Sequence, residues 1–110
     1  MSGSRSARRP APVFAALGDE TRLGLIARLS RGAPCSISTL SAGSGMTRQA
    51  VTKHLRVLER AGLVRGVRVG RERRFALEAE RLSGIRDYLD AVSKQWDDAL
   101  LRLKRFVERE

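Results

Sequence analysis

Apolar and polar side chains recur with a helical period between Thr47 and Ala61, and this is the clearest pattern in the chain. Thr47 suits the N-cap, because its hydroxyl can accept a backbone N–H that the first turn leaves unpaired. Gly62 suits the position just after the helix, where a left-handed residue closes the last turn. One face of this predicted helix (about 47–61) is apolar and consists of Ala50, Val51, His54, Leu55, Val57, Leu58 and Ala61. The opposite face is polar and consists of Arg48, Gln49, Thr52, Lys53, Arg56 and Arg60.

Strand-forming residues and arginines share the next segment, about residues 64–77, and predict a β-hairpin. Its apolar members are Val64, Val67, Val69, Phe75 and Leu77. Gly70 and Arg71 lie between the two predicted strands and suit a tight turn. The basic members are Arg65, Arg68, Arg71, Arg73 and Arg74. A polar-faced helix followed by such a hairpin is the arrangement of a recognition helix and a wing.

Shorter helices are predicted before residue 47. The first has an apolar face of Val13, Phe14, Ala16 and Leu17 and ends at Gly18. Asp19 and Glu20 open the second, where acidic side chains complement the positive end of the helix dipole. Its predicted buried stripe consists of Leu23, Ile26, Ala27 and Leu29. A third helix at about 36–42 and a glycine-containing turn at 43–45 complete a helix-turn-helix pattern.

The two ends of the chain differ in character. Residues 1–11 are rich in Ser, Arg and Pro and are predicted to be a disordered basic tail. The alternative is an arm whose arginines, Arg5, Arg8 and Arg9, reach phosphates or a minor groove. Residues 81–109 are predicted to form one long helix of about 45 Å. Its apolar residues follow a heptad spacing and are Ile85, Leu89, Val92, Trp96, Ala99, Leu103 and Phe106, with Tyr88, Leu100 and Val107 beside them.

The domain is too small to cover so long an apolar stripe, so a second copy of the chain is the expected partner. The alternative is that the helix folds back onto the first helix of the same chain. Trp96 and Tyr88 could also line a ligand cavity. The predicted fold class is mainly α with a small β-hairpin: a winged helix-turn-helix of about five helices, a wing and a long C-terminal dimerisation helix. A chain of 110 residues supports one such domain, at 12–110.

Charge changes this picture from a fold to a function. The net charge is +10, and nine basic against two acidic side chains lie between residues 45 and 77. A basic surface on the predicted recognition helix and wing is typical of nucleic-acid binding. Long donors and an amide suit base edges in the major groove, so Gln49, Thr52 and Lys53 are the candidate base readers, and Arg48 is expected to contact either bases or phosphate. The whole predicted DNA-contacting set is Thr47, Arg48, Gln49, Thr52, Lys53, His54, Arg56, Arg71, Arg73 and Arg74.

Other readings remain open at this point. His54 lies at the margin of the polar face, and packing or a backbone contact suits it at least as well as a phosphate. A winged helix can also serve as a protein-interaction module, or as an architectural binder without sequence preference. An enzyme is not expected, because the chain has no glycine-rich phosphate loop, nucleophile–base pair or metal constellation.

The sequence also bears on the compartment. The single cysteine, Cys35, cannot form an internal disulfide and fits a reducing environment, although it could act as a redox switch. No apolar run is long enough to cross a membrane, and no secretory signal precedes the domain. A cytoplasmic protein is therefore expected.

The runs VFAALGDETRLGLIARLSRG and GMTRQAVTKHLRVLERAGLVRGVRVGRERRFAL resemble the ArsR family of bacterial winged helix-turn-helix repressors. The resemblance covers about residues 12–77. It implies a homodimer joined through the first and last helices, and the expected dimerisation residues are Val13, Phe14, Leu17, Leu89, Val92, Trp96, Leu100, Leu103 and Phe106. It also implies double-stranded DNA with an inverted-repeat operator as partner, and repression at promoters that often include the protein's own.

The chain departs from the metal-sensing members of that family. They carry a Cys-x-Cys pair where this chain has Ser36-Ile37-Ser38, or Asp and His ligands on a last helix that here has no histidine. Zinc and soft metals prefer thiolate or imidazole ligands, so no metal site and no cofactor are predicted. A small-molecule effector of unknown chemistry remains open.

Overall fold

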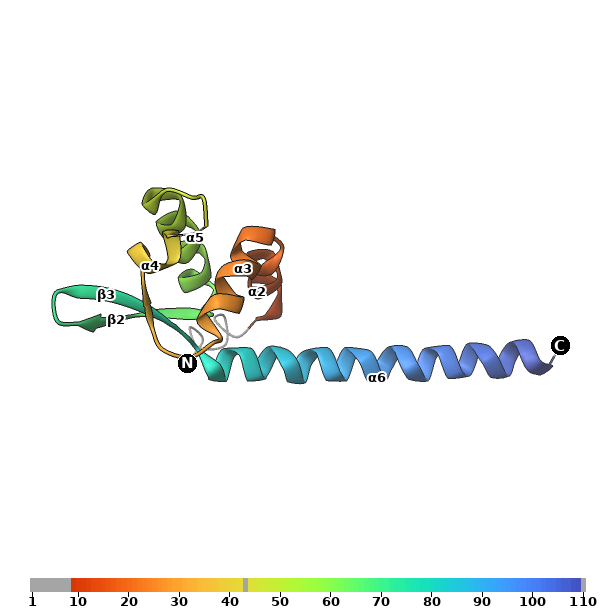
Figure 1. Cartoon of the computed structure of the whole chain (residues 1–110). Coiled ribbons are helices and arrows are strands. Elements are labelled where there is room, and N and C mark those ends of the chain that lie inside the picture. Colours follow the sequence, from red (N-terminus) through yellow and green to blue (C-terminus); the bar gives the residue numbers. More distant parts are fainter. Residues whose placement is uncertain (1–8, 43, 110) are drawn as a thin grey trace.

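A computed structural model describes residues 9–42 and 44–109 of the chain. The helices are α2 (Pro10–Leu17), α3 (Glu20–Leu29), α4 (Ile37–Ser41), α5 (Arg48–Arg60) and α6 (Ala79–Arg109). The strands are β1 (Cys35–Ser36), β2 (Val64–Val69) and β3 (Glu72–Leu77). Figure 1 shows a head built from α2–α5 and the sheet, from which α6 extends as a single rod. These elements confirm the predicted winged helix-turn-helix class, with five helices in the described residues.

The first helix begins earlier than predicted. α2 starts at Pro10, inside the stretch assigned to the tail, with proline in its first turn. Proline suits this position because its φ angle is already helical and its missing N–H would have no partner there. The rest of the predicted tail, residues 1–8, lies outside the described residues.

The core forms where α2, α3, α4 and α5 meet the sheet. Leu40, Val51, Leu55, Leu58 and Leu63 have no exposed surface. The predicted stripe of α3 was only partly right: Leu25 and Leu29 are 3% exposed, whereas Leu23 is 50% exposed and Ala27 is also exposed. Leu25 and Leu29 are one turn apart and so lie on the same face, which packing selects from several apolar positions on a short helix.

Val13 corrects the predicted dimerisation set. Its side chain is completely buried within a single chain, so it cannot contact a second copy. It packs in the same cluster as Ala16 and the α5 leucines. Phe14, one position later, is 37% exposed and lies 5.9 Å from Tyr88 of α6 between ring centroids.

Both ends of α5 are capped as the sequence predicts. The Thr47 hydroxyl accepts a hydrogen bond from the Ala50 amide at 3.0 Å. At the other end Gly62 has a φ of +80°, and the Leu63 amide donates to the Leu58 carbonyl at 3.0 Å. This is the arrangement of a Schellman cap, which needs a residue that tolerates the left-handed region.

The sheet has three antiparallel strands in the order β1-β3-β2, one more than predicted. The hairpin itself is confirmed, with Val69 opposite Glu72 and Gly70 at a φ of +64° in the turn. In β1, Cys35 pairs with Phe75 and Ser36 pairs with Arg74. Two residues carry no alternating pattern, so the sequence gives no signal for this strand.

α6 is a helix of 31 residues, about 46 Å long at the usual helical rise. Only its beginning packs on the head, where Ile85 is 7% exposed. Beyond Ile85, Val92 is half-buried and the other large residues of the apolar stripe are exposed: Leu89 49%, Trp96 65%, Leu100 56%, Leu103 57% and Phe106 63%. In the described residues α6 therefore does not fold back along its length onto α2. No described helix combines the length and the apolar character that a membrane span requires.

Candidate nucleic-acid interface

The outer face of α5 presents four polar side chains without covering structure. Arg48, Gln49, Lys53 and Arg56 are all exposed. Gln49 and Lys53 are one turn apart, and Arg56 continues the same face a turn later. Arg48, Gln49 and Lys53 belong to the first two turns, the part of a recognition helix that normally contacts base edges. These four predicted residues are therefore brought together on one surface.

Two threonines of the predicted set are partly engaged within the helix. Thr47 caps α5, and Thr52 donates its hydroxyl hydrogen to the Arg48 carbonyl at 2.7 Å. The Thr52 oxygen keeps lone pairs that can still accept a hydrogen bond from outside. Thr47 acts mainly by ordering the first turn, whose free N–H groups can bind a phosphate.

His54 is the clearest departure from the predicted DNA-contacting set. Its Nδ1 atom accepts a hydrogen bond from Arg22 Nη1 at 3.3 Å and lies 4.0 Å from an Asp19 carboxylate oxygen. Both partners belong to the start of α3, so the ring faces the inside of the head rather than the outer face of α5. These contacts favour the packing role for His54 that the sequence left open.

Arg22 holds three helices in place. Its Nε donates to the Ala16 carbonyl at 2.5 Å and its Nη2 to the Ala15 carbonyl at 3.5 Å, both near the end of α2. A guanidinium suits this place, because the last carbonyls of a helix lack partners and carry partial negative charge. Together with the bond to His54, these contacts connect α2 and α3 with the recognition helix.

Asp19 begins α3 as its N-cap, and its carboxylate accepts the Arg22 amide hydrogen at 3.0 Å. This backbone hydrogen bond, aided by the nearby charge of Arg22, lowers the pKa of Asp19 below its usual value, and partial desolvation opposes the shift. The ionised form is therefore the one that the folded chain favours.

Within the described residues, some wing arginines form ion pairs and others do not. Arg73 Nη2 lies 3.0 Å from Glu59 Oε2 of α5, and its guanidinium carbon lies 5.1 Å from the centroid of the Phe75 ring. A Cβ atom on Gly66 would come within 3 Å of that guanidinium, so this glycine leaves room for it. Arg73 therefore braces the wing against α5, which the sequence did not reveal.

The other wing arginines differ in the ion pairs that they form with described residues. Arg74 forms an ion pair with Glu72 at 2.8 Å, and Arg65 forms one with Glu78 at 2.8 Å. Arg71 in the turn and Arg68 on β2 are exposed. Arg68 lies opposite Arg73 across the hairpin and was not in the predicted set. Its place beside a bound arginine is set by the strand register, which the sequence does not give.

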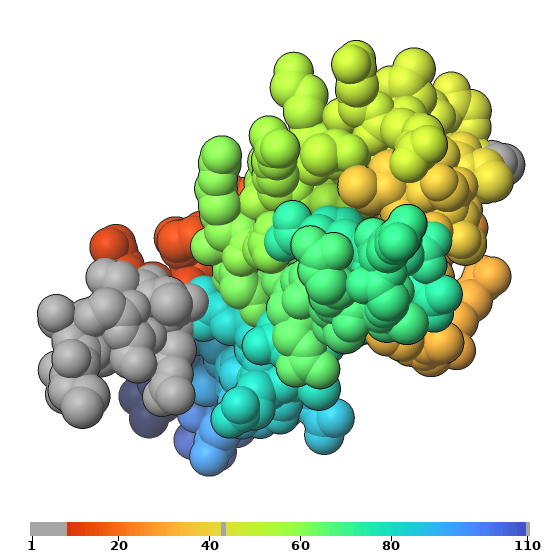
Figure 2. Space-filling model, turned by 90° about the vertical axis from the view of Figure 1, so that its left-hand side faces the viewer, coloured from red at the N-terminus to blue at the C-terminus, as the bar shows by residue number. Residues whose placement is uncertain are grey.

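Figure 2 shows that the outer side of α5 and the wing lie next to each other on one face of the molecule. Exposed polar side chains lie on both elements, and we call the following set the basic face: Arg48, Gln49, Lys53 and Arg56 of α5, and Arg68 and Arg71 of the wing. Such a surface can meet a duplex through base edges and phosphates together.

The described residues hold no group of three or more His, Cys, Asp or Glu side chains that could bind a metal ion. Ser36, which occupies the position of a metal-binding cysteine in the resembling sensors, caps α4 by accepting the Thr39 amide hydrogen at 3.1 Å. Cys35 is half-buried.

Comparisons with known proteins agree with this architecture. Residues 17–67 match the model of a helix-turn-helix domain family. The HTH-type transcriptional regulator Rv2034 of Mycobacterium tuberculosis is 32% identical over 103 residues, covering 94% of this chain and 92% of that protein. YuzN of Bacillus subtilis, an uncharacterised HTH-type transcriptional regulator, is 35% identical over 91 residues, covering 77% of this chain and 94% of that protein.

Among solved structures, an ArsR-like transcriptional regulator from Rhodococcus sp. RHA1 is 38% identical, with a TM-score of 0.78 over 94% of this chain and 95% of that one. These relatives are regulators of transcription, which confirms that the chain is not an enzyme. The chain belongs to the ArsR family of winged helix-turn-helix transcriptional regulators.

Proposed function

We propose that this regulator is a dimeric repressor that reads an inverted-repeat operator through α5 and the wing. The observation that carries the proposal is the basic face, where exposed donors of the recognition helix adjoin exposed wing arginines on one side of the molecule. A protein-interaction module would have no need of this concentration of charge, and an architectural binder would have no need of the Gln49 amide on the outer face of α5.

Each part of the basic face has a distinct task. Arg48, Gln49 and Lys53 enter the major groove and specify bases, and Thr52 can accept a hydrogen bond beside them. Arg56, Arg68 and Arg71 bind phosphates, which positions the protein without reading sequence. Arg73 and Arg74 contribute through the geometry of the wing, because both are held by acidic partners.

The apolar stripe of α6 supports the dimer. Trp96, Leu100, Leu103 and Phe106 are all more than half exposed in a single chain, which is a costly arrangement in water. Phe14 of α2 and Leu89 of α6 extend the stripe toward the head, and half-buried Leu17 and Val92 lie beside them. A second copy of the chain offers the same stripe, so a two-fold pairing covers both at once.

A two-fold dimer places two recognition helices for two half-sites, which is why the operator should be an inverted repeat. We further propose that the protein represses its own promoter by occupying it, as its resemblance to ArsR repressors implies. Bound protein would then exclude polymerase in proportion to its concentration.

Footprinting on the DNA upstream of its own coding sequence tests this function. We expect protection of one imperfect inverted repeat that overlaps the promoter, at protein concentrations about 10³-fold below those that cover shuffled DNA of equal composition. Equal protection of both duplexes would favour the architectural reading. Absence of binding to either duplex would favour the interaction module.

A further inference from the structure

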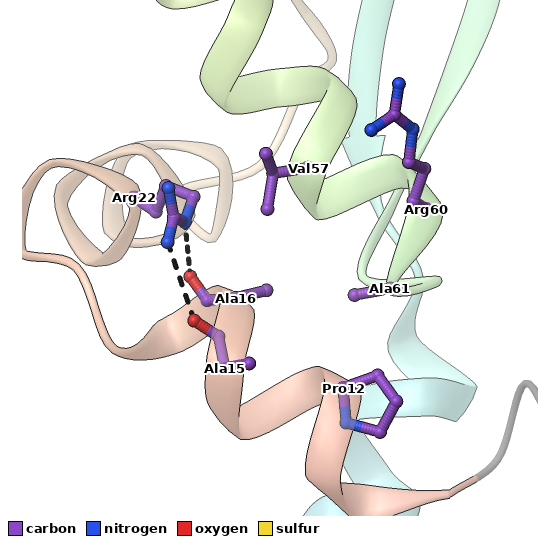
Figure 3. Close-up of a pocket in the computed structure, with 7 residues that line it drawn as sticks. All are labelled: Pro12, Ala15, Ala16, Arg22, Val57, Arg60 and Ala61. Carbon is purple, nitrogen blue, oxygen red and sulfur yellow. Dashed lines mark hydrogen bonds between the residues drawn. The ribbon is translucent and has the colours of Figure 1, made fainter.

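A groove lies between α2 and the last turns of α5, on a side of the head that the proposed function does not use. Its volume is about 430 Å³, within the range of small-ligand sites. Figure 3 shows its lining, which consists of Pro12, Ala15, Ala16, Arg22, Val57, Arg60 and Ala61. Five of these seven side chains are small and apolar, so within the described residues no side chain fills the space between the two helices.

Both charged residues of the lining are arginines, and no acidic residue belongs to it. Arg22 uses three of its donors within the head, which leaves two of its five N–H groups free. The Arg60 side chain forms no ion pair with the residues that the structure describes. Its neighbour Glu59 is already bound to Arg73. The groove therefore combines an apolar floor with uncompensated positive charge at its edge.

The groove stays open when the other surfaces are occupied. Phe14 contacts Tyr88 of α6 and lies roughly 160° around α2 from the centre of the groove residues, at the usual turn of a helix. A dimer formed through Phe14 and α6 would leave that side of α2 uncovered. On α5, Arg60 belongs to the last turn, whereas Gln49 and Lys53 belong to the first two.

We propose that this groove binds a small organic anion, with its carboxylate on the free N–H groups of Arg22, its hydrocarbon part on the apolar floor and the positive charge of Arg60 at the rim. A carboxylate can accept two parallel hydrogen bonds from a guanidinium. An inorganic ion has no apolar part that could pack against the apolar walls of the groove. The ligand class is therefore an aromatic or short aliphatic acid rather than phosphate or a metal.

Binding there would act on the recognition helix, and this step rests on the proposed function. Arg22 connects the end of α2 with His54 of α5. A carboxylate on the free N–H groups of Arg22 alters the geometry of these contacts and so shifts α5 relative to α2. The anion binds the two arrangements of α5 relative to α2 with different affinity, so its binding changes the affinity of the protein for DNA.

Titration of the full chain with 2-naphthoate, followed by amide NMR shifts, tests the site without DNA. We expect saturable shifts in α2 and the last turns of α5, with a Kd of about 1 mM. The uncharged 2-naphthamide should bind about tenfold more weakly. Arg60→Gln should weaken naphthoate binding to a similar extent. Arg31→Gln is the control: it removes the same charge from an exposed position outside the groove and should leave naphthoate binding unchanged.

Ala15→Leu provides a second variant, because it fills the groove without changing charge or helix propensity greatly. It should abolish naphthoate binding and keep the helical content. Absence of saturable shifts, equal binding of naphthamide, or equal loss in Arg31→Gln would each overturn the site. If naphthoate binds but leaves operator affinity unchanged, the regulatory step is wrong. Failure of the proposed function would appear separately, as absence of operator binding without any naphthoate.

Discussion

Arg73 of β3 and Glu59 of α5 form an ion pair at 3.0 Å that joins the wing to the recognition helix. The pair is supported by the Phe75 ring under the guanidinium and by the absence of a side chain on Gly66. A contact within the protein therefore favours one arrangement of the wing relative to α5.

A double-mutant cycle with Glu59→Gln and Arg73→Gln measures this brace. The two side chains are 36% and 56% exposed, so we expect a coupling of only about 0.2–1 kcal/mol in the free energy of unfolding. Urea denaturation provides the measurement. In a Gly66→Ala background the coupling should vanish, because the new methyl displaces the guanidinium. A coupling that persists unchanged there would contradict the role assigned to Gly66.

Gln49→Ala and Lys53→Ala should each reduce discrimination between operator and non-operator DNA by about 1–3 kcal/mol. Both residues are exposed, so helicity and dimer formation should be unchanged. Arg71→Gln is the matched control: it should weaken binding to all duplexes equally and flatten the salt dependence by about one unit. Equilibrium titrations at several salt concentrations separate the two behaviours. If Arg71→Gln instead lowered the affinity for operator DNA more than the affinity for other DNA, the wing would read bases and the assignment of that role to α5 would be wrong.

Trp96→Asp should convert the dimer into a monomer, because it places a charge in the apolar stripe of α6. Sedimentation equilibrium measures the change. Lys94→Glu alters charge on the same helix away from the heptad positions and should leave the dimer intact. A Trp96→Asp protein that remains dimeric would remove α6 from the interface.

The lowered pKa of Asp19 predicts a specific dependence of the free energy of unfolding on pH. Its pKa is lowered in the folded chain, chiefly by the hydrogen bond from the Arg22 amide. The stabilisation is therefore fully present above the unfolded pKa and is lost as the pH falls through the folded value. Asp19→Asn keeps a good N-cap but does not titrate, so its stability should fall less steeply below about pH 4 than that of the parent. If thermal unfolding showed that the stability of both proteins falls equally steeply with decreasing pH, Asp19 would not contribute to the pH dependence.

Much of the fold could be predicted because its signals are local. The caps at Thr47 and Gly62, the turn at Gly70 and the heptad spacing of α6 each depend on neighbours in sequence, and the structure confirms these elements. β1 could not be predicted, because two residues show no period and owe their conformation to pairing with β3.

The arginines show where sequence reasoning ends. Those of the recognition helix and wing look alike in the sequence, yet Arg73 forms an ion pair with Glu59, 14 residues away, whereas Arg71 forms none with the described residues. Likewise Arg22 meets His54 across 32 residues. Such contacts depend on how elements pack together, so composition identified the basic face as a whole but not the role of each cation.

Selection of bound duplexes from a random pool at physiological salt, followed by sequencing, tests the central claim most directly. We expect enrichment of one inverted repeat whose half-sites lie about one helical turn apart, as a two-fold dimer requires. The Lys53→Ala variant should still enrich the repeat, but it should accept several bases at one position, which is the same in each half-site. Retention of DNA without any enriched sequence would contradict the claim that α5 of this protein reads an operator.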